Sequence, residues 1–518
     1  MASGRSLPAN VLANWTGFAV GLLVNFFLSP LIVHHLGASA YGLWALLGTL
    51  TAYLGLLDLG IRSAVTRYVA RSQSQGDDAT ATQVVSTALA IFAVMAGIAL
   101  VASTLLGLLA PSVFRIPVEY RTTTLIVAVA AGASTAVALV NGAFGGVIVG
   151  LQRFDLVCVV DVATALVRAA LVLGVIAGGG GLVALAAAQL LASLAGALGT
   201  AWLGRRIYPG LRLRPAWSRP HLGLIVSYGG YTFVSQLAAS VIDRAGVIVL
   251  GVFLPMAAVT VFAIAAGLID YARSLVGGIR TTLAPQASAL EGLGQRDALR
   301  DLALRGARYC TLLAVPIAAT LALRGSSFIG LWMGAAYGGP SGAVLAVLAL
   351  RLVFLGATGA AANVMLGASR ERAVAGVLVA EAVISVGAML LLIEPFGLLG
   401  VAWGTTSPTV ATALVLWPWL LRQSFGVALR AYVGASWVRP VAAHLPFVGA
   451  TWLVEHSWPA SSLPVFIAQT AMLMPAALPG LWYVGLTAAE RHREGARHAG
   501  GGAVRRSRRV RPAARPAR

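Results

Sequence analysis

Long apolar runs separated by short polar turns constrain this chain more than any other feature of its sequence. Of its 518 residues, 58% are hydrophobic and 10% are charged, and the mean hydropathy is +0.85. A soluble fold of this length needs a large polar surface, which this composition does not supply. One membrane crossing by a helix needs about 20 apolar residues. The sequence therefore predicts an all-α polytopic membrane protein.

Clusters of glycine, proline and charge divide the apolar sequence into fourteen candidate spans. The spans are residues 10–36, 40–62, 82–110, 122–150, 154–177, 181–204, 222–253, 257–284, 302–323, 341–368, 373–393, 397–421, 440–455 and 463–487. No small-residue cleavage site follows a short apolar core near the N-terminus, so we expect the first helix to be retained. The longest connection expected outside, residues 324–340, is too short for a folded catalytic domain.

The distribution of arginine predicts the topology. The net charge is +20, and all 37 basic residues are arginine. The absence of lysine excludes Schiff-base chemistry and a Walker A phosphate loop. A cytoplasmic N-terminus places 30 of the 37 arginines in inside segments and three outside, at Arg115, Arg121 and Arg324. Because basic residues accumulate in cytoplasmic segments, this asymmetry predicts fourteen spans with both termini cytoplasmic.

An internal repeat predicts the domain organisation. At an offset of 218 residues, Gly60-Ile61-Arg62 matches Gly278-Ile279-Arg280, and Tyr53 matches Tyr271. Six helices return the chain to the same side, so the halves are expected to be parallel repeats with a site between them. The predicted parts are a six-helix lobe at 10–204, a basic cytoplasmic linker at 205–220, a second six-helix lobe at 221–422, two additional helices at 437–488 and a disordered, Arg-rich cytoplasmic tail at 489–518.

Several short motifs are similar to those of a known family. They are Leu36-Gly37, Tyr41-Gly42-Leu43-Trp44, the run Tyr53-Leu54-Gly55-Leu56-Leu57-Asp58-Leu59-Gly60, Arg67-Tyr68-Val69-Ala70 and Gly150-Leu151-Gln152-Arg153-Phe154. Across about residues 10–425 the chain resembles the polysaccharide and O-antigen flippases of the multidrug/oligosaccharidyl-lipid/polysaccharide exporter superfamily. The resemblance implies two six-helix lobes around a central cavity and an alternating-access mechanism. It also implies a location in the bacterial cytoplasmic (inner) membrane and transport of undecaprenyl-diphosphate-linked oligosaccharides to the outer leaflet. Multidrug exporters and lipid II flippases share the fold, so the fold alone does not name the substrate.

Charged residues within the spans are the candidate site residues, because they are costly in a membrane. Arginine suits a diphosphate because its planar guanidinium donates two parallel hydrogen bonds and stays charged. The candidates for the substrate diphosphate are Arg62, Arg244, Arg273 and Arg280. Arg62 and Arg280 match in the repeat, and positive-inside anchoring is the alternative role for both. Asp270 lies three residues before Arg273, so these two are also expected to pair locally.

The remaining intramembrane charges are candidates for ion coupling or for structural pairing. Asp161 and Arg168 are seven residues apart, and Asp243 precedes Arg244, so the latter two point about 100° apart on a helix. Arg351 and Glu381 are expected to pair across helices. Asp58 and Arg62 are four apart and are expected to form a pair on one helix face. Asn25 and Gln236 line a cavity or form interhelical hydrogen bonds.

No nucleophile, metal-ligand or acid–base constellation stands out, so we expect a transporter rather than an enzyme, with no metal and no cofactor. The leading hypothesis is a flippase for lipid-linked oligosaccharide that works with polysaccharide assembly machinery. A cation-coupled multidrug exporter and a lipid II flippase are the alternatives. Membrane lipid is an expected partner and nucleic acid is not, because the arginines are explained by topology. The coupling ion stays open, with Asp161, Asp243 and Asp270 as candidate carriers.

Overall fold

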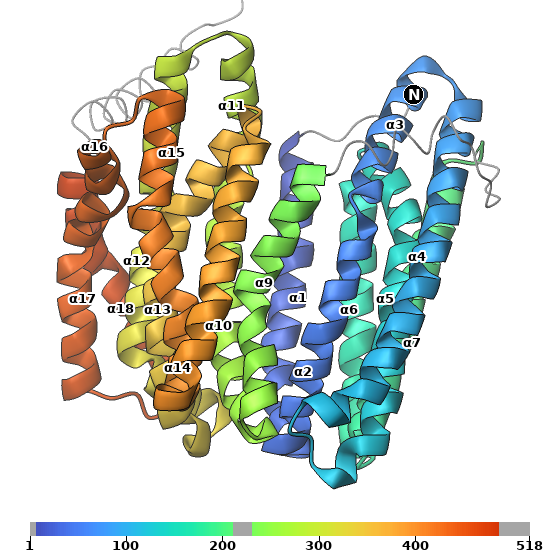
Figure 1. The fold of residues 1–518 in the computed structure, drawn as a ribbon, viewed down its shortest axis with the longest axis horizontal. Helices are drawn as coiled ribbons and strands as arrows, with labels where there is room; N and C mark the ends of the chain where they lie inside the picture. The colour runs from blue at the N-terminus through green and yellow to red at the C-terminus, as the bar shows by residue number, and fades with distance from the viewer. Residues whose placement is uncertain (1–6, 211–229, 486–518) are drawn as a thin grey trace, which may run out of the picture. The chain divides into compact units, whose positions relative to one another are not determined.

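The computed structural model describes residues 7–210 and 230–485, and these residues form helices and turns without a strand (Figure 1). The long helices are α1 (Leu7–Leu36), α2 (Ala38–Leu54), α3 (Ile61–Gln75), α4 (Asp78–Val113), α5 (Arg121–Gly150), α6 (Phe154–Ala177), α7 (Leu182–Ile207), α9 (Gly230–Phe253), α10 (Met256–Arg280), α12 (Arg296–Met333), α13 (Ala335–Gly367), α14 (Glu371–Leu414) and α17 (Arg439–Ser457). Shorter ones are α11 (Leu283–Gly292), α15 (Leu416–Phe425), α16 (Leu429–Val433), α18 (Leu463–Leu473) and α19 (Leu478–Gly480). The predicted fold class is confirmed: the chain is an all-α, multi-pass membrane protein.

Within the described residues, twelve helical stretches are long and apolar enough to cross a membrane. One of them, residues 371–425, covers two predicted spans, and Arg439–Ser457 is not among the twelve. The expected total of fourteen therefore stays a prediction, as do the cytoplasmic termini and the inner membrane. Arg5 and the tail after residue 489 lie outside the described residues.

Contacts divide the chain into two compact units. The first unit contains residues 1–271, 329–351 and 369–412, and the second contains 272–328, 352–368 and 413–518. These units do not follow the boundaries of the predicted repeat, and residues 211–220 of the predicted linker lie outside the described residues. The division into a lobe at 10–204, a lobe at 221–422 and an appendage at 437–488 therefore stays a prediction.

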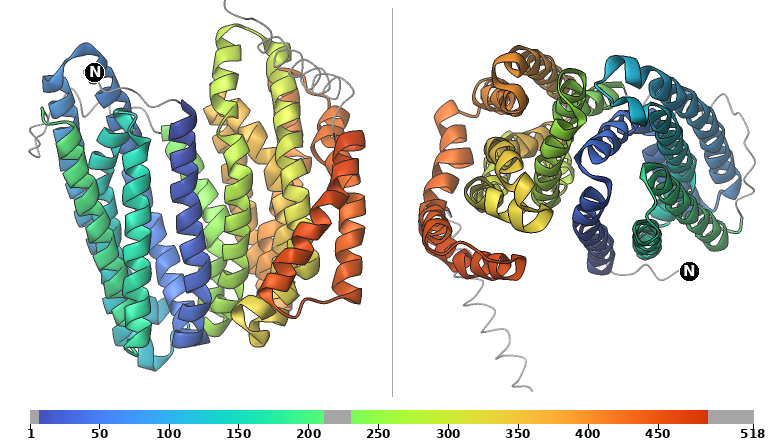
Figure 2. Two further views of the ribbon diagram at one scale, coloured as in Figure 1. Left: turned by 180° about the vertical axis from the view of Figure 1, so that it is seen from behind. Right: turned by 90° about the horizontal axis from the view of Figure 1, so that it is seen from below.

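In the first unit, α4, α5 and α7 lie side by side, and α1 packs along α6 (Figure 2). Small residues allow the close approach, as membrane helices require. A Cβ atom at Gly132 of α5 would lie 1.8 Å from Ser103 Oγ of α4. The rings and branched chains of Phe92, Val85 and Val147 fill the space between α4 and α5, where they are buried. This packing holds the inward faces of α5, α6 and α7 in fixed positions.

The predicted span 40–62 is interrupted before its end. α2 ends at Leu54 and α3 begins at Ile61, because Leu59 and Gly60 adopt left-handed conformations with φ of 47° and 77°. Asp58 and Arg62 therefore do not lie on one continuous helix, and the predicted i,i+4 pair on one helix face is wrong. Asp58 instead lies in the turn between the two helices, beside the first backbone N–H groups of α3.

The segment assigned as α14 folds back on itself at Gly397. The backbone there has φ 55° and ψ −126°, a conformation that glycine adopts without steric cost. Thr409 Oγ1 donates a hydrogen bond to Glu381 Oε1 at 2.7 Å, although 28 residues separate them. A straight helix would place them about 42 Å apart. The predicted spans 373–393 and 397–421 are therefore two antiparallel arms of a hairpin.

Two contacts fix helix ends outside the membrane-spanning segments. The Thr80 backbone N–H donates to Asp77 Oδ1 at 2.9 Å and caps α4, which holds the pKa of the Asp77 carboxyl below its usual range. The Tyr208 hydroxyl, just beyond α7, donates to Asp78 at 2.5 Å. Desolvation by burial, followed by the nearby Asp78 carboxylate, raises the pKa of Tyr208 to about 12. The phenol therefore stays a donor at physiological pH and ties α7 to α4.

Candidate functional site

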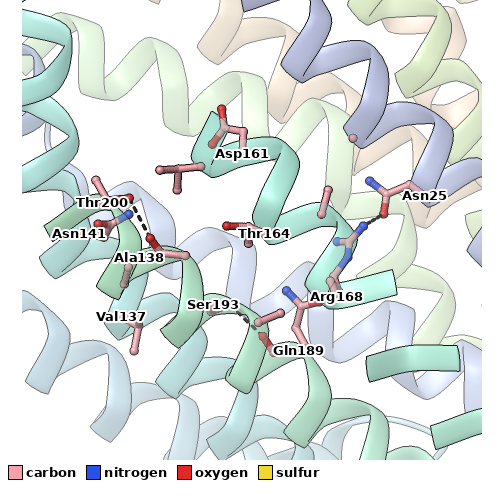
Figure 3. A pocket seen from close by; sticks show the side chains of 16 residues that line it. Asn25, Val137, Ala138, Asn141, Asp161, Thr164, Arg168, Gln189, Ser193 and Thr200 are labelled. Carbon is pink, nitrogen blue, oxygen red and sulfur yellow. Dashed lines mark hydrogen bonds between the residues drawn. The ribbon is translucent and has the colours of Figure 1, made fainter. Parts of the chain in front are cut away.

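The first unit encloses a polar cavity of about 320 Å³ between α1, α5, α6 and α7 (Figure 3). Helical spacing explains how its walls form. On α6, Asp161, Thr164 and Arg168 recur at i, i+3 and i+7 and share one face. On α7, the wall is built by Gln189, Ser193, Gly196 and Thr200, again at helical spacing. Asn25 of α1 and Asn141 of α5 complete the polar lining.

Arg168 binds an amide across this cavity. Its Nη2 donates a hydrogen bond to Asn25 Oδ1. Arg168 and Asp161 share the cavity, but the ion pairs of the described residues do not include these two side chains. Arg62 of α3 interacts electrostatically with Asp161. Asn25 therefore lines the cavity and forms an interhelical bond at the same time.

A second cavity of about 230 Å³ adjoins the first. Asn25, Arg168 and Gln189 line both. Three aromatic residues complete the second cavity: Tyr41, Trp44 and Tyr271. Ser29 lines the same cavity and donates a hydrogen bond to the Asn25 carbonyl at 2.8 Å. The two cavities form one polar region whose centre is Arg168.

A third cavity, of about 430 Å³, lies where the α2–α3 turn faces α9. Its polar lining includes Asp58, Gln236 and Arg244. The structure thus places the predicted candidate Arg244 and the predicted polar position Gln236 in one cavity. Asp58, which the sequence suggested only as a helix-surface pair, faces the same space.

Asp243 turns away from Arg244 into a buried network. Arg351 Nη2 of α13 donates to Asp243 Oδ1 at 2.9 Å, and Arg351 Nε donates to Thr409 Oγ1 at 3.1 Å. Thr409 and Thr412 donate to the two Glu381 oxygens at 2.7 and 2.9 Å. Arg351 and Glu381 are therefore linked through a threonine hydroxyl, and the expected direct pair is wrong. Sequence reasoning had no signal for Thr409, because a lone threonine is ordinary in a membrane helix.

The repeat-matched arginines each lie against a glycine within their own unit. A Cβ atom at Gly145 of α5 would lie 3.1 Å from Arg62 Nη2. A Cβ atom at Gly359 of α13 would lie 2.2 Å from Arg280 Nη1. Each guanidinium thus occupies space that glycine leaves open on a neighbouring helix. On α10, Asp270 is exposed and Arg273 is partly buried, and their predicted pairing stays a prediction.

The second unit contains a buried polar cluster around one arginine, Arg324, that the sequence analysis missed. Arg324 was expected in an outside loop, but it lies within α12 and is fully buried. Its Nε donates to Glu455 Oε2 of α17 at 2.8 Å, and its Nη2 donates to Gln469 Oε1 of α18 at 2.5 Å. Its guanidinium lies 4.4 Å from the ring centroid of Phe466. The signal was the pair of opposite charges, Arg324 and Glu455, at the ends of two predicted spans.

Polar cavities inside an all-helical membrane bundle are typical of membrane transporters. The family model described as polysaccharide biosynthesis protein matches residues 7–291, which is more than half of the chain. The chain belongs to this family.

Solved structures share the fold. A lipid II flippase, MurJ, in an inward closed conformation has a TM-score of 0.68 at 10% identity, covering 91% of this chain and 97% of that one. An inward-facing multidrug resistance transporter of the MATE family and the MOP superfamily has a TM-score of 0.65 at 16% identity, covering 78% and 97%. The MATE multidrug transporter DinF-BH has a TM-score of 0.58 at 18% identity, covering 82% and 97%. No curated protein matches the chain.

Proposed function

We propose that this protein translocates undecaprenyl-diphosphate-linked oligosaccharide from the cytoplasmic to the outer leaflet for surface polysaccharide synthesis. The observation that carries the proposal is membership of the polysaccharide biosynthesis family over residues 7–291. The fold supports it, since a lipid II flippase with a lipid-linked substrate has the same architecture. A polar head group needs polar surroundings inside the membrane, and the cavities around Arg168 and Arg244 supply them.

Arginine side chains are the proposed ligands of the diphosphate. Arg62 and Arg280 take equivalent roles in the two repeats, and Arg244 and Arg273 add positive charge along α9 and α10. Each guanidinium is able to donate two parallel hydrogen bonds to a phosphate and does not lose its charge. The remaining charges Asp161, Asp243 and Asp270 are the candidates for a coupled proton or cation.

Contacts at one end of the first unit support an alternating-access mechanism. Trp332 Nε1 donates to the Phe26 carbonyl at 3.1 Å, and the two rings stack with centroids 4.6 Å apart. Gly42 of α2 lies directly against the Met256 carbonyl of α10. We call the turns α1–α2, α9–α10 and α12–α13 the closed end. In the predicted topology this end is the outer one.

The proposal predicts that diphosphate ligands are essential for export. In a strain without the chromosomal gene, the Arg273→Ala, Arg280→Ala double variant is expected to restore less than about 10% of wild-type surface polysaccharide at normal protein levels, because each lost charged contact costs about 1.5–3 kcal/mol. The Arg71→Gln variant changes an exposed arginine of α3 and should restore export fully. Unchanged export by the double variant would remove both arginines from the mechanism.

Cation-coupled multidrug export is the alternative, because MATE transporters share the fold. Drug-susceptibility profiling of the deletion strain separates the two functions. If the protein is a flippase, the deletion strain loses surface polysaccharide and keeps its drug tolerance. If it is a multidrug exporter, the strain keeps its surface polysaccharide and becomes more sensitive to drugs. Loss of viability through arrested cell-wall synthesis would favour the lipid II alternative. Adjacent assembly machinery in the inner membrane is a proposed partner of the flippase.

A further inference from the structure

The guanidinium of Arg168 lies inside the first unit, and its contacts leave its positive charge uncompensated. Arg168 lies in the middle of α6, and its hydrogen bond within the described residues goes to a neutral amide, Asn25. The ion pairs of residues 7–210 and 230–485 do not include it. A charge inside the membrane is costly even when it is only partly buried, as Arg168 is, so such a group needs water or an anionic ligand.

The surrounding cavity offers acceptors as well as donors. Asp161 lies on the same face of α6, seven residues or about 10 Å along the helix from Arg168. Asn141 Oδ1 is buried and has no hydrogen-bond partner among the described residues. A simple inorganic anion brings acceptors alone and would leave Asp161 and Asn141 unsatisfied. The lining therefore fits a ligand that is negative at one end and rich in hydroxyl groups elsewhere.

Aromatic residues complete the site at the Arg168 end. Tyr41, Trp44 and Tyr271 line the adjoining cavity, which shares Arg168 and Gln189 with the first. Such residues combine an apolar ring face with a polar edge. A pyranose ring has the complementary chemistry, with C–H bonds on its faces and hydroxyl groups around its rim. The larger cavity alone, at about 320 Å³, lies within the usual range of about 300–1,000 Å³ for small-molecule sites.

We propose that the cavity between α1, α5, α6 and α7 binds an acidic sugar. Arg168 binds the carboxylate of the sugar, and Asp161 accepts hydrogen bonds from its hydroxyl groups. The inference rests on the proposed function, since the sugar would be a unit of the translocated oligosaccharide. It assigns recognition of the glycan to the interior of the first unit. Its arginine, Arg168, is not one of the four arginines proposed to bind the diphosphate.

Binding of sodium D-glucuronate to the purified full-length protein in detergent tests the site. D-glucose and sodium phosphate, at matched ionic strength, are the reference ligands, and calorimetry or thermal shift is the measurement. We expect saturable binding of glucuronate, with glucose and phosphate at least 10-fold weaker. The Arg168→Gln variant should weaken glucuronate binding at least 10-fold, Arg168→Lys less so, and Arg71→Gln not at all.

Three results would overturn the proposal: equal binding of glucose and glucuronate, phosphate binding that depends on Arg168 without glucuronate binding, or glucuronate binding unaffected by Arg168→Gln. If Arg168→Gln does not fold, Gln189→Ala and Asp161→Asn carry the test, each with an expected 3- to 10-fold loss. Transport is measured separately. Glucuronate binding without any oligosaccharide export would overturn the proposed function and leave the site intact, whereas export with no glucuronate binding would overturn the site alone.

Discussion

We expect the Gly42→Leu variant to abolish surface polysaccharide export while the protein still reaches the membrane. A Cβ atom at Gly42 would lie 1.9 Å from the Met256 carbonyl oxygen and 3.0 Å from Thr260 Oγ1. Backbone atoms cannot move aside as a flexible side chain does, so α2 and α10 would have to separate. The closed end could then no longer form, and alternating access requires it to form in each cycle. Overpacking of this kind costs about 1–3 kcal/mol, or roughly a 5- to 150-fold shift between states.

Gly48→Leu is the matched control for this prediction. Gly48 lies on the same helix six residues further on, and a Cβ atom there would meet nothing within 4 Å. Both variants carry the same intrinsic effect of replacing glycine in a helix. We expect Gly48→Leu to export normally and Gly42→Ala to fall between the two. Normal export by Gly42→Leu at wild-type protein levels would show that the closed end is not part of the transport cycle.

The second large effect is expected at Arg324. The Arg324→Gln variant should lose about 3–5 kcal/mol of stability, because it leaves Glu455 without its guanidinium partner in a buried site. Ser327 also donates to this carboxylate and would compensate for little of the lost charge. Thermal unfolding in detergent, at one fixed detergent concentration, measures the change. We expect the helices α17 and α18 to detach first, since Arg324 contacts both.

Two further variants separate this cluster from a general effect of removing arginine. Arg305 lies on the same helix and forms an exposed pair with Asp301 at 3.7 Å, so Arg305→Gln should cost less than about 0.5 kcal/mol. The double variant Arg324→Met, Glu455→Gln removes both charges and should recover most of the stability lost by Arg324→Gln. Equal losses in the single and double variants would contradict a buried ion pair.

Hydrophobicity predicted the helical membrane fold, because crossing a bilayer imposes a length that any suitable segment must meet. The interruptions were harder to place. The break at Leu59 and Gly60 depends on two left-handed residues, and one of them is a leucine, which carries no turn signal. The hairpin at Gly397 was anticipated as two spans, since Pro395 and Gly397 are recognisable helix breakers.

The sequence predicted which charged residues belong to the candidate site, but not which side chains they contact. Asp161 and Arg168 are seven residues apart, a spacing that puts them on one helix face, and both line one cavity. The spacing did not find Asn25 as the partner of Arg168, because that contact joins α1 to α6 across 143 residues. Periodicity reports which residues share a face, whereas the face of the neighbouring helix depends on tertiary packing. For the same reason Arg351 was matched to Glu381 and not to the intervening Thr409.

Translocation in vesicles tests the central claim most directly. The purified protein is reconstituted into vesicles with undecaprenyl-diphosphate-linked oligosaccharide extracted from the deletion strain, and the glycan exposed outside is measured with a membrane-impermeant glycan-modifying enzyme. We predict that wild-type protein converts the protected fraction into the accessible one with time, and that the Arg273→Ala, Arg280→Ala variant does not. A protected fraction that stays the same in vesicles with and without folded wild-type protein would contradict the account.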